Sequence, residues 1–349
     1  MTDKAIRIAG REIGRGHRPY VIAELSGNHN GDIERAFRLM DVAKGAGADA
    51  VKLQTYTADT ITLDHDGPGF TVQGGLWDGK RLHELYREAH TPWGWHPALF
   101  DHARKIGITC FSSPFDSTAI EFLETLDTPA YKIASFELVD TPLIRRAART
   151  GKPLILSTGM ANAEEIDDAL SAARSGSGGV VLLHCVSGYP TPAAEANLSR
   201  IPALAARHGC DVGLSDHTLG TEVAVAAAAL GAAVIEKHFT LARADGGPDA
   251  AFSLEPDELA ALVKGVRTAH EALGHADYGR TASEQPNVMF RRSLYAVEDI
   301  KAGELLTEKN VRSIRPGYGL SPKYLPEILG RRAQTAIARG TPMAFYLVE

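Results

Sequence analysis

Short apolar runs alternate with longer segments of helical composition along most of the chain. Eight runs of four to seven residues have the length and composition of buried strands: residues 20–25, 49–54, 108–112, 130–134, 154–157, 180–186, 212–215 and 233–237. Eight helical segments follow them, at residues 33–46, 97–105, 117–126, 142–150, 163–174, 199–207, 221–230 and 256–273. Glycines such as Gly107, Gly151 and Gly209 stand at helix ends, where they stop helices. The pattern predicts eight consecutive βα units.

Eight strands that alternate with eight helices predict an α/β fold, a closed (β/α)8 TIM barrel, rather than an open doubly wound sheet. An open sheet of the dinucleotide-binding kind carries a glycine-rich turn after a strand, and this sequence has none. In a (β/α)8 barrel, the chemistry lies where the strands end and the βα loops begin. The predicted strand ends are therefore the places to look for a site.

Every predicted strand ends in, or is followed by, at least one polar residue. These residues are Glu24, Lys52, Gln54, Ser112, Ser113, Lys132, Ser135, Glu137, Ser157, Ser187, Tyr189, Ser215, His217 and His238. Polar residues are common in loops, so any one of them alone is unremarkable. Their recurrence at all eight strand ends predicts one polar site at one end of the barrel.

Two successive βα units end in histidine. The runs that lead to His217 and His238 flank an alanine-rich helical segment closed by Gly231. Parallel strands place both imidazoles at the same end of the barrel, where they can share a metal ion. Two nitrogens are fewer than a zinc site usually has, so manganese, magnesium or cobalt is the expected metal. Of the other histidines, only His29 remains a candidate, and the rest are expected to pack or to face solvent.

Two lysines lie inside apolar strand runs, at Lys52 and Lys132. A lysine that points into a barrel needs an anion, and two lysines with several serines suit a phosphate or carboxylate group. Lys132 is alternatively a Schiff-base lysine of the aldolase kind. Glu24 and Glu137 stand near these lysines and either divide acid and base work or pair with them. Asp249, on a loop after His238, either binds a ligand amide or hydroxyl or caps a turn.

The loop after the second strand is unusually long, from residue 55 to about residue 95. It contains glycines, the tryptophans Trp77, Trp93 and Trp95, and one expected short helix at residues 81–89. Loops of this length are usually lids or binding surfaces. The aromatic content indicates an ordered lid.

The periodicity fades after the eighth helix. Residues 1–273 form the expected catalytic barrel, residues 274–290 a charged connector, and residues 291–349 a second, small, mainly β domain. Two similar turns, around Gly303 and Gly340, separate its short β runs. A domain of this size has a marginal core, so we expect it to dock on another surface.

Charge and composition exclude several classes of partner. The chain has 349 residues, with 43 Asp and Glu against 37 Lys and Arg, and no dense basic tract, so nucleic acid is not an expected partner. It lacks a signal-peptide core and any apolar run near the ~20 residues of a membrane span. Cys110, Cys185 and Cys210 are too far apart for a Cys-x-x-Cys motif, and the first two are expected to pack as small buried hydrophobic residues. We expect a reduced, soluble, cytoplasmic protein.

Motifs along nearly the whole chain resemble the sialic-acid synthase family, enzymes that condense phosphoenolpyruvate with an amino sugar. The motifs are IAELSGNHNGD, GADAVKLQTY, SSPFD, AYKIASFE, KPLILSTGM, HCVSGYPTP, GLSDHT, IEKHFT and GGPDAAFSLEP. The last ~60 residues resemble the antifreeze-like (SAF) domain that follows the barrel in this family. The resemblance implies a phosphoenolpyruvate pocket of Lys52, Ser113, Lys132, Ser135, Ser157, Ser187 and Ser215.

The same resemblance implies the remaining roles. His217 and His238 would bind a divalent metal, usually manganese, while Glu24, Glu137 and Asp249 would contact the sugar or move protons. Gln54 and Tyr189 are expected to bind substrate. Arg315 would reach the active site of the partner subunit in a domain-swapped homodimer.

Two departures bear on the acceptor sugar. Ser187 stands where N-acetylneuraminate synthases usually carry asparagine in the HC-x-N-x-YP motif, which puts the role of Ser187 in doubt. The segments GGLWDGK and HTPWGW of the long loop resemble pseudaminic acid synthases, whose acceptor is 2,4-diacetamido-2,4,6-trideoxy-L-altrose. The alternatives are N-acetylneuraminate or legionaminate synthesis from N-acetylmannosamine or a diacetamido-trideoxymannose. A metal-dependent hydrolase gives no reason for paired lysines, and a carbohydrate-binding protein would leave the metal site idle.

Overall fold

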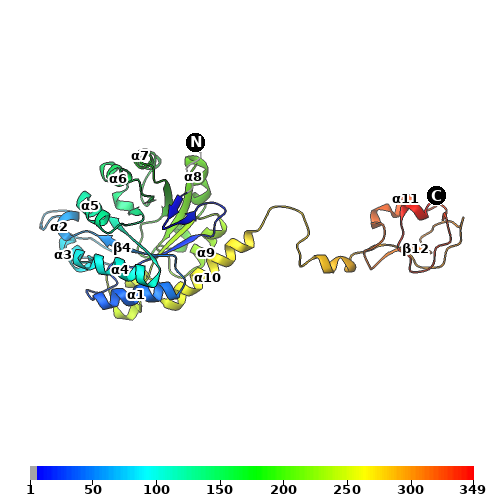
Figure 1. Cartoon of the computed structure of the whole chain (residues 1–349), viewed down its shortest axis with the longest axis horizontal. Helices are drawn as coiled ribbons and strands as arrows, with labels where there is room; N and C mark the ends of the chain where they lie inside the picture. The colour runs from blue at the N-terminus through cyan, green and yellow to red at the C-terminus, as the bar shows by residue number, and fades with distance from the viewer. Residues whose placement is uncertain (1–5) are drawn as a thin grey trace. The chain divides into compact units, whose positions relative to one another are not determined.

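The structure is a computed structural model that describes residues 6–349 (Figure 1). The chain divides into two compact units, Met1–Gly274 and His275–Glu349, and each is described by itself. The first unit contains the strands and helices that were predicted to form a barrel.

Eight parallel strands close into a barrel in the order β10-β3-β4-β5-β6-β7-β8-β9. The predicted (β/α)8 barrel is confirmed. The strands are β3 Tyr20–Glu24, β4 Ala50–Thr55, β5 Thr109–Pro114, β6 Tyr131–Ile133, β7 Leu154–Ser157, β8 Val180–Cys185, β9 Asp211–Asp216 and β10 Val234–His238. In the closing pair, Val234 is in register with Tyr20 and His238 with Glu24, so the last strand ends level with the first.

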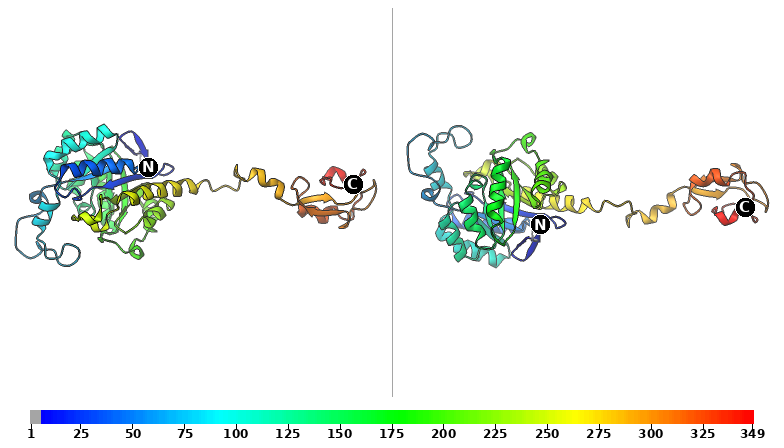
Figure 2. Two further views of the ribbon diagram at one scale, coloured as in Figure 1. Left: turned by 90° about the horizontal axis from the view of Figure 1, so that it is seen from below. Right: turned by 90° about the horizontal axis from the view of Figure 1, so that it is seen from above.

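Helices surround the strands on the outside of the barrel (Figures 1 and 2). They are α1 Ile33–Gly45, α4 His96–Ile106, α5 Ser117–Thr125, α6 Thr141–Ala148, α7 Ala163–Ala173, α8 Arg200–His208, α9 Glu222–Ala229 and α10 Pro256–Leu273. Asp32, Asp116, Asp140 and Asn162 cap the starts of four of them through side-chain hydrogen bonds. Among residues 6–349, no helix is long and apolar enough to cross a membrane.

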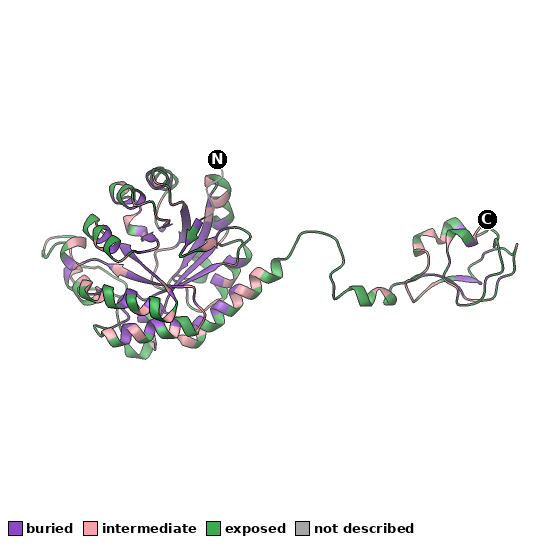
Figure 3. Cartoon of the chain, in the orientation of Figure 1, coloured by how far each residue is buried: buried purple, intermediate pink, exposed green. Residues whose placement is uncertain are grey.

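The strand side chains alternate between two cores. On β10, for example, Ile235 faces outward into the main hydrophobic core between strands and helices, whereas Val234 faces into the barrel. The strands are consequently buried on both faces, as Figure 3 shows. The inward positions near the C-terminal strand ends are polar, and they build the candidate site.

An N-terminal hairpin closes the opposite end of the barrel. Strands β1 Ile6–Ile8 and β2 Arg11–Ile13 pair antiparallel, and Ile6, Ile8 and Ile13 pack with the inward residues at the strand starts. Asp49, just before β4, binds the side chains of Arg11 and Arg18 from this segment. This hairpin was not predicted, because three-residue strands are too short to show a period.

The second unit has its own small core. Strands β11 Ser293–Ala296 and β12 Val311–Ile314 pair antiparallel, helix α11 covers Leu325–Ile328, and a 3-10 turn covers Gln285–Phe290. Isolated bridges such as Ile300 with Ile337 extend the β character.

Candidate active site

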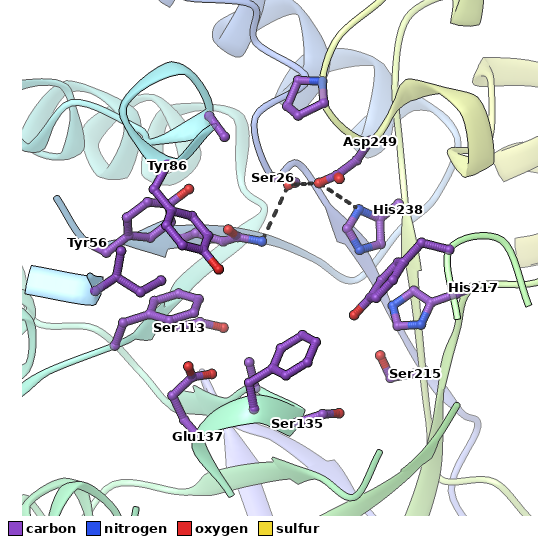
Figure 4. Close-up of a pocket in the computed structure, with 18 of the residues that line it drawn as sticks. Ser26, Tyr56, Tyr86, Ser113, Ser135, Glu137, Ser215, His217, His238 and Asp249 are labelled. Carbon is purple, nitrogen blue, oxygen red and sulfur yellow. Dashed lines mark hydrogen bonds and ion pairs between the residues drawn. The ribbon is translucent and has the colours of Figure 1, made fainter. Parts of the chain in front are cut away.

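Polar side chains from the strand ends surround a cavity of about 380 Å³ at the C-terminal end of the barrel (Figure 4). The predicted site residues that line it are Lys52, Gln54, Ser113, Lys132, Ser135, Glu137, Tyr189, Ser215, His217, His238 and Asp249. They come from all sides of the barrel, because each stands on an inward position at a strand end or on the loop that follows. The structure thus brings eleven separated positions into one cavity.

Four charged side chains form a continuous set of buried ion pairs inside the barrel. Lys52 Nζ lies 2.9 Å from Glu24 Oε2 and 3.2 Å from Glu236 Oε1, and Lys132 Nζ lies 3.2 Å from the same Glu236 oxygen. None of these side chains exposes more than 5% of its surface. Such burial is tolerable only because each charge faces an opposite one.

The pairing decides the charge states. Burial alone would lower the pKa of Lys52, but the carboxylates of Glu236 and Glu24 outweigh it and raise that pKa. Burial would likewise raise the pKa of Glu236, but Lys132 and Lys52 lower it to about 2. Burial raises the pKa of Glu24 despite the pairing with Lys52, and it lowers the pKa of Lys132. Lys52 and Glu236 are therefore the firmly charged members of the set.

Glu236 is a site residue that the sequence pattern did not single out. It lines the cavity, and Ser215 Oγ donates a hydrogen bond to its Oε1 at 3.0 Å. The signal was available, since a two-residue period on β10 places Glu236 on the same inward face as His238.

His217 and His238 face one another across neighbouring strands, with ring centroids 5.4 Å apart. His217 Nδ1 lies 3.0 Å from Val186 O, and its donation to that carbonyl leaves Nε2 free to bind a metal. Burial, and then His217, lower the pKa of His238, which favours the neutral imidazole that a metal requires. In the described part of the chain no group of three or more His, Cys, Asp or Glu is placed to hold a metal. The two imidazoles therefore fit an ion whose other ligands are water or substrate.

Cys185 differs from its expected role as a packing residue only. It is buried, but it lines the cavity, and its Sγ lies 3.9 Å from His217 Nδ1. Cys110 is buried between strands and helices, as expected. The other candidate histidine, His29, is buried away from the cavity lining, with Nε2 against Thr91 Oγ1 and its ring against Trp95.

Serine hydroxyls and one backbone N–H form a small cradle beside Lys132. Gly159 N donates to Ser135 Oγ at 3.1 Å, and the buried Ser187 Oγ has no protein partner. A Cβ added to Gly159 would lie 2.2 Å from Ser187 Oγ and 2.7 Å from Ser135 Oγ, so only glycine fits against these two hydroxyls. Of these groups only Ser135 lines the cavity, as Lys132 does, and a hydroxyl and a lysine together are suited to the oxygens of a phosphate. Gly159 was not predicted, although it follows Ser157 by two residues.

Carboxylates occupy the opposite parts of the cavity wall. Asp249 accepts a hydrogen bond from Ser26 Oγ, and its Oδ2 lies 3.6 Å from His238 Nδ1 (Figure 4). Burial raises the pKa of Asp249 and raises that of Glu137 to about 7. Glu137 Oε2 is buried and has no protein partner. A carboxyl group with a pKa near neutrality is suited to hold or release a proton.

The long loop after β4 is an ordered lid that contributes one wall of the cavity. It contains the short helices α2 Ala58–Ile61 and α3 Leu82–Ala89. Trp77 Nε1 donates to Pro248 O at 3.0 Å, and Trp93 Nε1 donates to Tyr56 O at 3.1 Å. Trp77 thus attaches the lid to the loop after β10, and Trp93 joins the two ends of the lid.

Four predicted site residues do not line the cavity. Glu24, Ser157 and Ser187 are barrel residues behind its wall; Glu24 contributes through Lys52, and the Ser157 and Ser187 hydroxyls are buried without a protein partner. Arg315 belongs to the second unit, after β12, and its role stays a prediction.

Comparison with known proteins identifies the family. The sequence matches the NeuB family over residues 39–278 and the SAF domain over residues 291–344. The chain belongs to the NeuB family and carries a SAF domain at its C-terminal side, so the predicted resemblance is confirmed.

Two curated relatives and one solved structure show the degree of similarity. The pseudaminic acid synthase of Campylobacter jejuni subsp. jejuni serotype O:23/36 (strain 81-176) is 46% identical over 92% of this chain and 94% of its own. The N,N'-diacetyllegionaminic acid synthase of Campylobacter jejuni subsp. jejuni serotype O:2 is 38% identical over 90% and 95%. The crystal structure of N-acetylneuraminic acid synthetase from Leptospira borgpetersenii serovar Hardjo-bovis, in complex with citrate, is 34% identical over 82% and 96%, with a TM-score of 0.73.

Proposed function

We propose that this protein is a pseudaminic acid synthase, which condenses phosphoenolpyruvate with 2,4-diacetamido-2,4,6-trideoxy-L-altrose and water to give pseudaminic acid and phosphate. The observation that carries the proposal is the meeting of an anion site, built on Lys52 and Lys132, with a histidine pair in one cavity. The higher identity to a pseudaminic acid synthase, 46% against 38% for a legionaminic acid synthase, supports this acceptor.

Phosphoenolpyruvate carries two anionic groups, and the cavity offers two cationic places for them. The phosphate is assigned to Lys132 and the Ser135 hydroxyl, which both line the cavity, and the Gly159 N–H and Ser187 Oγ lie next to Ser135 Oγ in the wall. Lys52, whose Nζ donates to Ser113 Oγ at 3.3 Å, is assigned to the carboxylate. Glu236 holds both lysines in place and keeps their charge balanced when the substrate is absent.

His217 and His238 are assigned to a divalent metal, with Mn²⁺ first and Mg²⁺ or Co²⁺ as alternatives. Such an ion, when bound, supplies polarisation of the acceptor's aldehyde oxygen. The chain's own part is to orient the imidazoles: the Val186 carbonyl fixes the ring of His217, and Asp249 stands beside that of His238.

The reaction forms one carbon–carbon bond and breaks one carbon–oxygen bond. C3 of phosphoenolpyruvate attacks the aldehyde carbon of the open-chain acceptor, and the aldehyde oxygen takes up a proton. The cation left at C2 adds water, which gives up a proton. The C2–O bond to phosphate then breaks, the new C2 hydroxyl loses its proton, and the 2-keto acid and phosphate are released.

Glu24 and Glu137 are the two candidates for these proton transfers. Glu137 lines the cavity with an unpaired carboxyl oxygen and a pKa of about 7, so it exists in both protonation states near neutrality. Glu24 acts from behind Lys52, in contact with Gln54 Nε2 at 3.1 Å. Asp249 and Tyr189 are assigned to the acceptor.

A homodimer completes the proposal, with Arg315 of the SAF domain reaching the cavity of the partner subunit. Light scattering tests it, and a monomer at working concentration contradicts it.

Oxygen labelling tests the bond that breaks. Turnover in ¹⁸O-labelled water, with Mn²⁺, phosphoenolpyruvate and the diacetamido-trideoxy-altrose, should release unlabelled phosphate, because the phosphate keeps its own bridging oxygen. A hydrolase that attacks phosphorus would give labelled phosphate without an acceptor. Sugar binding without any phosphate release would mark a binding protein instead.

A further inference from the structure

The lid helix α3 presents its apolar face to the cavity rather than to the hydrophobic core. Four residues at spacings of three and four line the cavity: Leu82, Leu85, Tyr86 and Ala89. This spacing puts them on one face of the helix. Glu84, Arg87 and Glu88 are exposed on the other face. Helix α3 is thus amphipathic, and its apolar face is turned toward the cavity.

Two further lid residues extend this apolar wall. Ile61, at the end of α2, and Val72, between α2 and α3, also line the cavity. Like Leu82 and Tyr86, they are only half-buried, so part of their surface meets whatever fills the cavity. Covering such apolar surface with an apolar group is favourable, because it removes that surface from water. The wall therefore favours a ligand that is apolar where it touches the lid.

The part of the lid that includes helix α3 stands across the cavity from the histidine pair (Figure 4), whereas Trp77 lies nearer to it, against Tyr189. In Figure 4, Tyr56 and Tyr86 lie on the side opposite His217 and His238. The proposed reaction places the acceptor's aldehyde, C1, at the histidines. The far end of an extended six-carbon chain is C6, which consequently faces helix α3.

The apolar side chains of the wall favour some substituents at C6 over others. Ile61, Val72 and Leu82 have no side-chain hydrogen-bond donor or acceptor. A methyl group at C6 would bury apolar surface against them, whereas a hydroxymethyl group would lose hydrogen bonds to water without replacement.

We propose that Ile61, Val72 and Leu82 determine acceptor specificity by selecting a C6 methyl group over a C6 hydroxymethyl group. The inference rests on the proposed function, since it uses the position of the reacting aldehyde. An apolar pocket discriminates against one added hydroxyl by roughly 10- to 100-fold.

Two acceptors that differ only at C6 test the proposal: 2,4-diacetamido-2,4,6-trideoxy-L-altrose and its 6-hydroxy counterpart. The ratio of their kcat/KM values is measured for the natural protein and for Leu82→Asn, a substitution of similar volume. The natural protein should favour the methyl acceptor by at least about 10-fold, and Leu82→Asn should reduce that ratio by about 10-fold. The KM for phosphoenolpyruvate should not change.

Leu63→Asn is the matched control, because Leu63 is a lid leucine that is 63% exposed and is not among the residues lining the cavity. Its ratio should equal that of the natural protein. Val72→Thr keeps the shape of the side chain and adds a hydroxyl. If circular dichroism shows that Leu82→Asn does not fold, Val72→Thr replaces it, and the ratio of kcat/KM values should fall in this variant instead.

Equal use of both acceptors by the natural protein, or equal ratios in Leu82→Asn and Leu63→Asn, would overturn the lid inference alone. Absence of phosphate release with either acceptor would overturn the proposed function, and the lid inference with it.

Discussion

The carboxylate of Glu236 and the ammonium of Lys132 lie 3.2 Å apart inside the barrel, and neither side chain exposes more than 5% of its surface. The same carboxylate is shared with Lys52, so one acidic residue balances two buried lysines. Removing one partner of a buried pair leaves an uncompensated charge in a low-dielectric interior, which is much costlier than losing a surface pair.

Glu236→Gln should therefore lower the free energy of unfolding by about 3–5 kcal/mol. Urea denaturation at neutral pH measures it. Glu88→Gln is the control, since the pair of Glu88 with Lys80 is largely exposed and is worth at most about 1 kcal/mol. Equal losses in the two variants would mean that Glu236 does not hold the lysines.

Glu137 should make both activity and stability depend on pH. Burial raises its pKa from 4.5 to about 7, so between these values the folded protein keeps a proton that the unfolded chain has released. This group consequently lowers stability progressively as the pH rises from about 4.5 to about 7, and Glu137→Gln should abolish that part of the decline.

The activity profile gives the catalytic readout of the same group. If Glu137 donates a proton, kcat/KM for the acceptor falls as the pH rises through about 7, and Glu137→Gln flattens the inflection. Glu24→Gln is measured alongside. If both variants keep the profile of the natural protein, neither residue moves the proton.

Filling the serine cradle should weaken phosphoenolpyruvate binding. In Gly159→Ala the new Cβ would lie 2.2 Å from Ser187 Oγ and 2.7 Å from Ser135 Oγ, so the Ser135 hydroxyl in the cavity wall must move, and the Kd by calorimetry should rise at least about 10-fold. Gly45→Ala places its Cβ in open space and should bind normally. An unchanged Kd in Gly159→Ala would move the phosphate to another part of the cavity.

The histidine pair predicts a specific loss of metal binding. Titration of Mn²⁺, followed by the electron paramagnetic resonance of the free ion, should show one site that His217→Asn or His238→Asn weakens by more than about 10-fold. His270→Asn, at the end of helix α10, should leave it intact. Retention of the site in both site variants would exclude these imidazoles as ligands.

The barrel was predictable because its strands are buried on both faces and read as apolar runs separated by glycine-terminated helices. The strand ends then located Lys52, Lys132, His217 and His238. Glu236 was missed because a single acidic residue inside such a run looks like part of the strand, although the alternation of side chains points it inward. Gly159 was missed because a glycine after a strand usually marks a turn, and only coordinates show that a Cβ would fill the cradle.

The sequence did not indicate which strand-end residues are buried inside the cavity wall. Ser157 and Ser187 stand at strand ends like the others, yet neither lines the cavity, and their hydroxyls are buried without a protein partner. The lid was recognisable by its length and tryptophans. Its apolar face became a specificity element only when the structure showed α3 lining the cavity.

The most direct test of the proposed function is phosphate release from phosphoenolpyruvate with Mn²⁺, with 2,4-diacetamido-2,4,6-trideoxy-L-altrose and N-acetylmannosamine offered in parallel. We predict turnover with the altrose and little or none with N-acetylmannosamine. Preference for N-acetylmannosamine would contradict the pseudaminate assignment and place the protein among the neuraminate synthases.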